Sequence, residues 1–168
     1  MVPERTEYCY SLLREISNAG HTIGIHSASH DYEKIYASVD AFLEDFNEAY
    51  EIVLEATGKA PDIYRFPGGS VNDYNEKTRD DIIAEMDRRG FTYFDWNVDS
   101  NDWQGYGWTT LYTNVLKDAE EFSSPVILFH NTGDRDNTVL VIEDIIKALK
   151  NKGYKFGSLS QKIKPVQF

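Results

Sequence analysis

Two of the four histidines stand four residues apart in the segment HSASH, which runs from His26 to His30 and follows a short β-branched run. Neutral imidazole is a good zinc ligand, so this pair could hold a metal ion if a tight turn brought the two rings together. By itself, such a pair more often reflects surface or capping histidines. His21 lies at the other end of the apolar run, and we expect it to be structural.

Two further segments place a chemically capable side chain at the end of an apolar run. RFPGGS begins at Arg65 and continues into a Pro-Gly-Gly turn, whose backbone N–H groups can approach a ligand as closely as an oxyanion site requires. VILFHN contains His130, which could carry a proton to a leaving group if a carboxylate held its other ring nitrogen. Taken singly, a solvated arginine at a turn and a satisfied core histidine explain these segments better.

The segment DWNVDSNDW joins carboxylates to aromatic rings. Asp99 and Asp102 could orient a histidine or accept a hydrogen bond from a sugar hydroxyl. The aromatic rings that could stack on a pyranose follow at Trp103, Tyr106 and Trp108. A packed tryptophan with a turn-capping aspartate explains the segment equally well.

These segments are separated by stretches with helical periodicity, so strands and helices alternate along the chain. We expect helices over residues 4–19, 38–56, 76–89, 110–121 and 138–150. We expect strands over residues 22–26, 63–66, 91–98 and 126–130, with a last short one near 154–157. The alternation predicts an α/β fold in one domain, residues 1–168, whose parallel sheet is either open or closed into a barrel. The chemically capable residues then share the carboxyl edge of the sheet, where such folds build their sites.

Composition limits the partners. The net charge of −11, from 17 Lys and Arg against 28 Asp and Glu, disfavours nucleic acid and anionic lipid and allows neutral or cationic substrates. No apolar run approaches the ~20 residues of a membrane span, and the first residues lack the apolar core of a signal peptide. The single cysteine, Cys9, excludes an internal disulfide and a cysteine-rich metal site.

In this order, the segments resemble four of the five motifs of the polysaccharide deacetylases, carbohydrate esterase family 4 (the NodB-homology domain). The resemblance spans roughly residues 12–159 and rests on HSASH, RFPGG, DSNDW and LFH. It implies a distorted parallel (β/α) barrel that hydrolyses N-acetyl or O-acetyl groups of a peptidoglycan or chitin-like glycan. It also implies an extracellular or cell-wall-associated protein.

The resemblance assigns roles to the first two segments. It implies that His26 and His30 bind a divalent ion, most commonly zinc, with cobalt or nickel as alternatives. It implies that Arg65 braces the catalytic carboxylate. The backbone N–H of Gly68 would help to hold the oxyanion, although many relatives carry tyrosine at this position.

The last two segments would supply the acid and the substrate pocket. The resemblance implies that Asp102 tunes the catalytic histidine, His130, which acts as the general acid. Trp103 and Leu128 would line the acetyl pocket. An aromatic groove for the glycan would be completed by Tyr106 and Trp108.

One family motif has no counterpart in the sequence. Thr-Phe-Asp-Asp-Gly supplies the general base and the third metal ligand in relatives, whereas the Asp80-Asp81 pair here lies mid-helix. Asp134 and Asp136, in a later loop, are conceivable substitutes. We therefore expect a barrel without its first strand, weak metal binding, little or no deacetylase activity, and an exposed sheet edge that favours self-association. The alternatives are an enzyme whose first motif lies upstream or is replaced by other residues, an inactive remnant that binds glycan, and a fragment whose function belongs to a longer parent protein.

Overall fold

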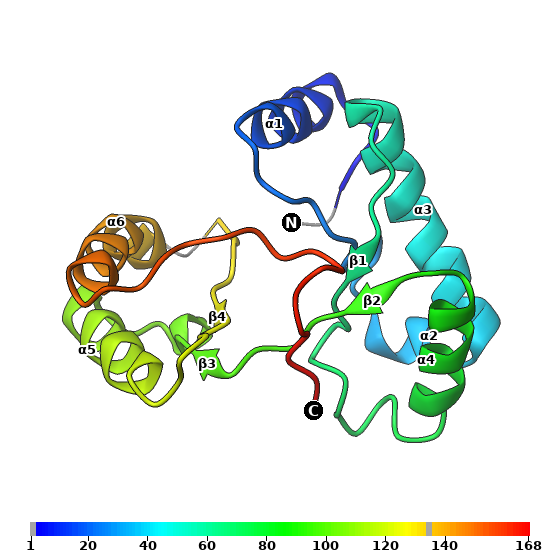
Figure 1. Cartoon of the computed structure of the whole chain (residues 1–168). Coiled ribbons are helices and arrows are strands. Elements are labelled where there is room, and N and C mark those ends of the chain that lie inside the picture. Colours follow the sequence, from blue (N-terminus) through cyan, green and yellow to red (C-terminus); the bar gives the residue numbers. More distant parts are fainter. Residues whose placement is uncertain (1–2, 134–135) are drawn as a thin grey trace. The chain divides into compact units, whose positions relative to one another are not determined.

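The structure, a computed structural model, describes residues 3–133 and 136–168, which form two compact units (Figure 1). The large unit contains residues 3–95 and the C-terminal segment 158–168, and the small unit contains residues 96–133 and 136–157. Each unit has its own buried apolar core. The expectation of one domain over residues 1–168 stays a prediction.

The large unit packs helices against a short parallel sheet. Its elements, in chain order, are α1 (Glu7–Asn18), α2 (Tyr32–Ile35), α3 (Val39–Thr57), β1 (Ile63–Tyr64), α4 (Arg79–Arg88) and β2 (Thr92–Tyr93). β1 pairs with β2 in parallel, with Ile63 opposite Thr92. On its other side, β1 forms a parallel bridge between Tyr64 and the single residue Ile25. Three neighbouring segments of the chain therefore run in the same direction, and each continues into a loop at its carboxyl end.

Local signals in the sequence set the ends of the longest helix, α3. The Ser38 hydroxyl accepts a hydrogen bond from the Ala41 N–H (3.1 Å), which satisfies one of the free donors of the first turn. Gly58, with φ of 69°, ends the helix in the left-handed conformation that glycine adopts without a steric cost. Between these ends, one face of α3 is apolar and buried, and it packs on α1 and α2.

The core of the large unit is built largely from aromatic rings. Phe66, which directly follows Arg65, is fully buried, and its ring centroid lies 5.5 Å from that of Phe42 on α3. The rings of Tyr64 and Tyr93 lie 5.2 and 5.4 Å from the Phe66 ring. Because Phe66 is tightly packed in this cluster, the Pro-Gly-Gly turn that follows it begins at a residue with a fixed position.

The small unit repeats the strand-helix pattern. Its elements are β3 (Val98–Asp99), the short 3₁₀ helix η1 (Asp102–Gln104), α5 (Trp108–Ala119), β4 (Ile127–Leu128) and α6 (Asp136–Asn151). β3 and β4 pair in parallel, with Val98 opposite Ile127. The apolar faces of α5 and α6 pack together and bury Val115 and Val141 completely.

The five predicted helices are confirmed to within a few residues, and so is the parallel pairing of strands. The short elements α2 and η1 were not predicted. No helix in the described part of the chain is long and apolar enough to cross a membrane.

Three strand predictions were wrong in detail. The strand expected over 22–26 is reduced to the bridge at Ile25. The strand expected over 91–98 is two strands, β2 and β3, because the N–H of Asp95 donates instead to the carbonyl of Val166 (2.7 Å). Residues 154–157 form no strand within the described ranges; the Tyr154 N–H is taken by the carbonyl of Leu149 at the end of α6 (3.0 Å).

Close pairing of the Ile25 segment with β1 depends on Gly24. A Cβ at this position would lie 3.1 Å from both the carbonyl oxygen and the Cγ1 atom of Ile63. We predict that Gly24→Ala lowers the free energy of unfolding by about 1–3 kcal/mol, because the two segments must separate. Gly157→Ala, where a Cβ meets nothing within 4 Å, is the control and should change it by less than about 0.5 kcal/mol. Urea unfolding measures both, and equal stability of Gly24→Ala and wild type would contradict the prediction.

Candidate functional site

The two histidines of HSASH lie side by side. Their ring centroids are 5.1 Å apart and the rings are tilted by 56°. His26 follows the bridge residue Ile25, and its Nδ1 lies 2.9 Å from the carbonyl oxygen of Arg65. A carbonyl can only accept, so Nδ1 carries the proton and the Nε2 lone pair is left for a ligand. The chain between His26 and His30 therefore makes the tight turn that is needed to bring the two rings together.

The environment of His26 keeps its ring neutral. Burial lowers its pKa from 6.5 to about 4, against the opposing effect of the hydrogen bond to Arg65. The nearby His30 adds to this lowering. An imidazole must be neutral to bind a metal ion, so His26 is in the ligand state throughout the neutral range.

A buried carboxylate on α3, Asp45, holds the loop that carries both histidines. Its Oδ2 accepts hydrogen bonds from the Ser27 hydroxyl (2.6 Å) and the Ala28 N–H (3.0 Å), and its Oδ1 accepts one from the Ser29 N–H (2.8 Å). The Ser27 hydroxyl oxygen in turn accepts the N–H of His30 (2.7 Å). Burial raises the pKa of Asp45, but these hydrogen bonds outweigh it and leave the pKa below its ordinary value. Asp45 is therefore ionised, and its hydrogen bonds hold the loop in place.

Sequence reasoning missed Asp45, although a signal was present. The residue stands three positions after Phe42 and one before Phe46, on the apolar face of the helix. A carboxylate on a buried face needs donors from elsewhere in the chain. That requirement points to a neighbouring polar loop.

Backbone strain in this loop is confined to His30. Its φ of 57° is in the left-handed region, which non-glycine residues adopt seldom. The hydrogen bond from its N–H to Ser27 holds the conformation, and its ring lies 5.3 Å from the ring of Tyr32. Strain of this kind is often found where a side chain must point in a defined direction.

The turn after Arg65 is held by a second buried carboxylate, Asp95. Its Oδ1 accepts the N–H of Ser70 (2.8 Å) and its Oδ2 accepts the Ser70 hydroxyl (2.6 Å). The Arg65 guanidinium donates to the carbonyls of Phe94 (2.9 Å) and Asp95 (3.3 Å). Arg65 therefore ties the turn to the end of β2. Its predicted role in bracing a catalytic carboxylate stays a prediction.

Gly68 presents its backbone outward. It is exposed, with φ of 77°, and among the described residues no acceptor takes the hydrogen bond of its N–H. This N–H is thus open to a ligand, as an oxyanion contact requires.

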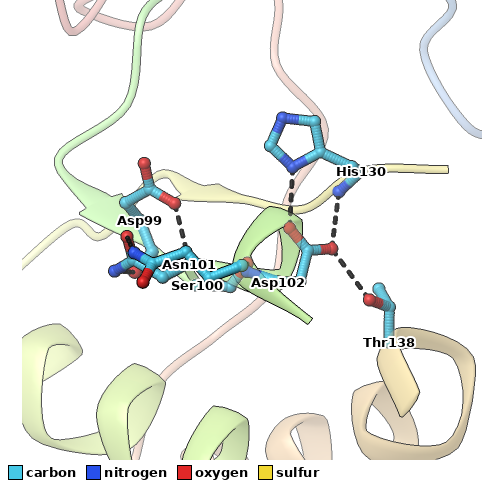
Figure 2. Close-up of polar contacts among 7 residues, drawn as sticks. Asp99, Ser100, Asn101, Asp102, His130 and Thr138 are labelled. Carbon is cyan, nitrogen blue, oxygen red and sulfur yellow. Dashed lines mark hydrogen bonds and ion pairs between the residues drawn. The ribbon is translucent and has the colours of Figure 1, made fainter. Parts of the chain in front are cut away.

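In the small unit, Asp102 and His130 form a carboxylate–imidazole pair (Figure 2). Nδ1 of His130 lies 2.7 Å from Oδ1 of Asp102, and the His130 N–H donates to Oδ2 (2.8 Å). The ionised carboxylate only accepts, so Nδ1 carries a proton and Nε2 is left to exchange one. The Asp102 side chain is fully buried, whereas 38% of the His130 side chain is exposed. The histidine is both oriented and accessible.

Thr138 on α6 completes this pair and was missed from the sequence. Its hydroxyl donates to Oδ2 of Asp102 (2.8 Å), as Figure 2 shows. Burial raises the pKa of Asp102, but the hydrogen bonds from His130 and Thr138 outweigh it and hold the pKa below its usual value. Nothing in the sequence marks Thr138 beyond a polar side chain near a helix start.

The aromatic residues expected to line a groove differ from one another in their exposure and contacts. Trp103 is 54% exposed on η1, and the Tyr106 hydroxyl donates to the Gln104 side chain (2.6 Å). Trp108 opens α5 and stacks on Tyr112, with centroids 4.9 Å apart. Leu128, in β4, is buried. The predicted pocket and groove stay a prediction.

The predicted site residues thus fall into two groups. The large unit holds the first group: His26, His30, Arg65 and Gly68. The small unit holds the second group: Asp102, Trp103, Tyr106, Trp108, Leu128 and His130. Asp99 belongs to the small unit too and accepts the Asn101 N–H (2.8 Å).

The histidine pair fits two positions of a zinc-type site, since both rings are neighbours and Nε2 of His26 is free. Within the described ranges, no group of three or more His, Cys, Asp or Glu side chains could hold a metal. Of the two aspartates considered as a possible third ligand, Asp136 is the first residue of α6 and Asp134 lies outside the described residues.

Known proteins are similar to this chain in sequence and in fold. The sequence profile described as polysaccharide deacetylase matches residues 1–91. A peptidoglycan-N-acetylglucosamine deacetylase of Bacillus cereus is 30% identical over 151 residues, 86% of this chain and 52% of that protein. The chain spans about half the length of the curated relatives it matches first.

Two solved structures extend the comparison. The catalytic domain of peptidoglycan N-acetylglucosamine deacetylase from Eubacterium rectale is 31% identical, with a TM-score of 0.88 over 95% of this chain and 74% of that chain. A carbohydrate esterase family 4 pseudoenzyme from Bacillus anthracis is 20% identical, with a TM-score of 0.77 over 96% of this chain and 53% of that chain. The predicted fold class, α/β of the type found in these deacetylases, is confirmed.

The low pKa of His26 makes a prediction about pH. Its pKa is about 4 in the folded chain and near 6.5 when exposed, so between these values the unfolded chain binds more protons. The free energy of unfolding should therefore fall as the pH drops through this window, and the fall should be smaller in His26→Asn, which keeps a donor for Arg65. Urea unfolding in EDTA and NMR titration of the ring measure this. A His26 ring that titrates near its ordinary value would contradict it.

Proposed function

Because this chain belongs to the polysaccharide deacetylase family, we propose that it supplies the metal-binding histidines and the proton donor of an enzyme that removes acetyl groups from a cell-wall glycan. The single observation that carries the proposal is the paired imidazoles of His26 and His30, held in place by Asp45. A buried carboxylate that holds a loop with two adjacent histidine rings is expected where those rings must be kept in place for a ligand.

Each group has a task in amide hydrolysis. A divalent ion held by His26 and His30 would supply Lewis-acid chemistry at the acetamide. The N–H of Gly68 donates a hydrogen bond to the carbonyl oxygen as negative charge develops there. Nε2 of His130, with Nδ1 held by Asp102, delivers a proton to the departing sugar amine. Water is the nucleophile: its oxygen bonds to the acetyl carbon as the C–N bond breaks, and acetate and a free amino sugar are the products.

For the substrate, we propose the N-acetylated glycan of peptidoglycan. The Bacillus cereus and Eubacterium rectale relatives are both named peptidoglycan N-acetylglucosamine deacetylases. The net charge of −11 disfavours polyanions and is compatible with a glycan that becomes cationic as acetyl groups leave. Exposed rings such as Trp103 offer surfaces on which sugar rings can stack.

A second candidate is glycan binding without hydrolysis. It is favoured by one observation: the described residues contain no group of three metal ligands. A site with only two histidine ligands holds zinc weakly, and amide hydrolysis without a positioned base is about 10²–10⁴ slower. In this case the aromatic residues would bind the glycan, and the chain would not hydrolyse it.

We predict that the 168-residue polypeptide with added zinc releases acetate from peptidoglycan fragments at less than about a tenth of the rate of a complete relative. A chimera that joins a family Thr-Phe-Asp-Asp-Gly segment to its N-terminus should be active. In the chimera, His130→Gln should lower kcat by about 10²-fold or more, because the amine then leaves unprotonated.

The control is His21→Gln, a histidine outside the proposed site, which should leave the rate of the chimera unchanged. A chimera that binds zinc and glycan but releases no acetate would support the binding function instead. A chimera whose rate is unaffected by His130→Gln would contradict the assigned proton donor.

A further inference from the structure

Tyr32 stands beside both the histidine pair and the Gly68 turn. Its ring centroid lies 5.3 Å from that of His30. A Cβ added at Gly68 would lie 3.3 Å from the Cε2 atom of Tyr32 and 3.3 Å from its hydroxyl oxygen. The phenol end of the side chain therefore lies against the backbone of Gly68. All three residues belong to the large unit.

Neighbouring rings and hydrogen bonds fix the position of Tyr32. It is the first residue of α2, whose start is capped by Asp31, which accepts the Lys34 N–H (3.2 Å). An edge-to-face contact with Tyr74 holds one side of the ring, with centroids 5.2 Å apart. A tilted contact with Tyr36 holds another, with centroids 6.1 Å apart. The hydroxyl is thus placed before any ligand arrives.

The Tyr32 hydroxyl is available to a ligand. Its neighbour Tyr36 uses its hydroxyl to bind the carbonyl of Pro67 (2.7 Å), whereas the Tyr32 hydroxyl has no hydrogen-bond partner in the part of the chain that the structure describes. The Gly68 N–H beside it also lacks an acceptor among those residues. Two adjacent donors without acceptors, next to a candidate metal ligand, form the arrangement that stabilises a developing oxyanion.

We propose that Tyr32 contacts the substrate, and that its hydroxyl donates a hydrogen bond to the same acetyl carbonyl oxygen as the Gly68 N–H. This inference rests on the proposed function and adds a residue to it. It also explains why position 68 is glycine in this chain. A side chain there would meet the phenol of Tyr32 and would have to adopt φ of 77°.

Acetate, the product anion, tests the proposal without requiring turnover. Sodium acetate is titrated into the zinc-supplemented chain, and the backbone amide of Gly68 is followed by NMR. In wild type the amide should shift on binding. In Tyr32→Phe, which keeps the ring and removes only the hydroxyl, the acetate dissociation constant should rise at least about threefold.

Tyr74→Phe is the matched control, because its ring touches Tyr32 and it too loses a hydroxyl. It should leave the dissociation constant within about twofold of wild type. Equal effects of the two variants would overturn the proposal, as would a wild-type Gly68 amide that does not respond to acetate. Absence of acetate release by the chimera would count against the proposed function alone, since acetate binding is measured separately.

Discussion

The Asp45 carboxylate is buried on α3, and the loop that follows Ile25 wraps around it to supply three donors. A buried carboxylate that lost these donors would cost several kcal/mol, so the loop has little freedom to adopt another path. The Ser27 hydroxyl links Asp45 to His30, because it donates a hydrogen bond to the Asp45 carboxylate and accepts one from the N–H of His30. The backbone conformation at His30 is therefore held by a charge on a neighbouring helix.

The same arrangement recurs at the other loops that carry chemistry. Asp95 fixes the turn around Gly68 by accepting two hydrogen bonds from Ser70, and Asp102 fixes His130 with help from Thr138. At these two loops the chain arrives from a short parallel strand, β1 or β4, and a buried carboxylate sets the loop's conformation. Strands of two residues are enough because side-chain hydrogen bonds do part of the positioning.

The sequence predicted the helices, the parallel strands and the chemically capable residues, because periodicity and motif spacing are local properties. It did not predict Asp45 or Thr138 as partners, because their roles depend on which loop packs against which helix. The prediction of one continuous strand across Asp95 was wrong for the same reason. Its N–H is claimed by Val166, far along the chain, and no window of neighbouring residues contains that information. The position of Trp108 on the α5 helix, stacked on Tyr112, was likewise not foreseen.

The zinc dissociation constant of Asp45→Asn, compared with wild type, tests the central claim most directly. Asparagine keeps the size of the side chain but cannot accept all three hydrogen bonds, so the account predicts that zinc affinity falls by about 10–100-fold while the chain stays folded. Glu44→Gln, an exposed carboxylate on the same helix, should leave the affinity unchanged. Equal zinc affinity in Asp45→Asn and wild type would contradict the account, because the histidine pair would then not depend on the buried carboxylate.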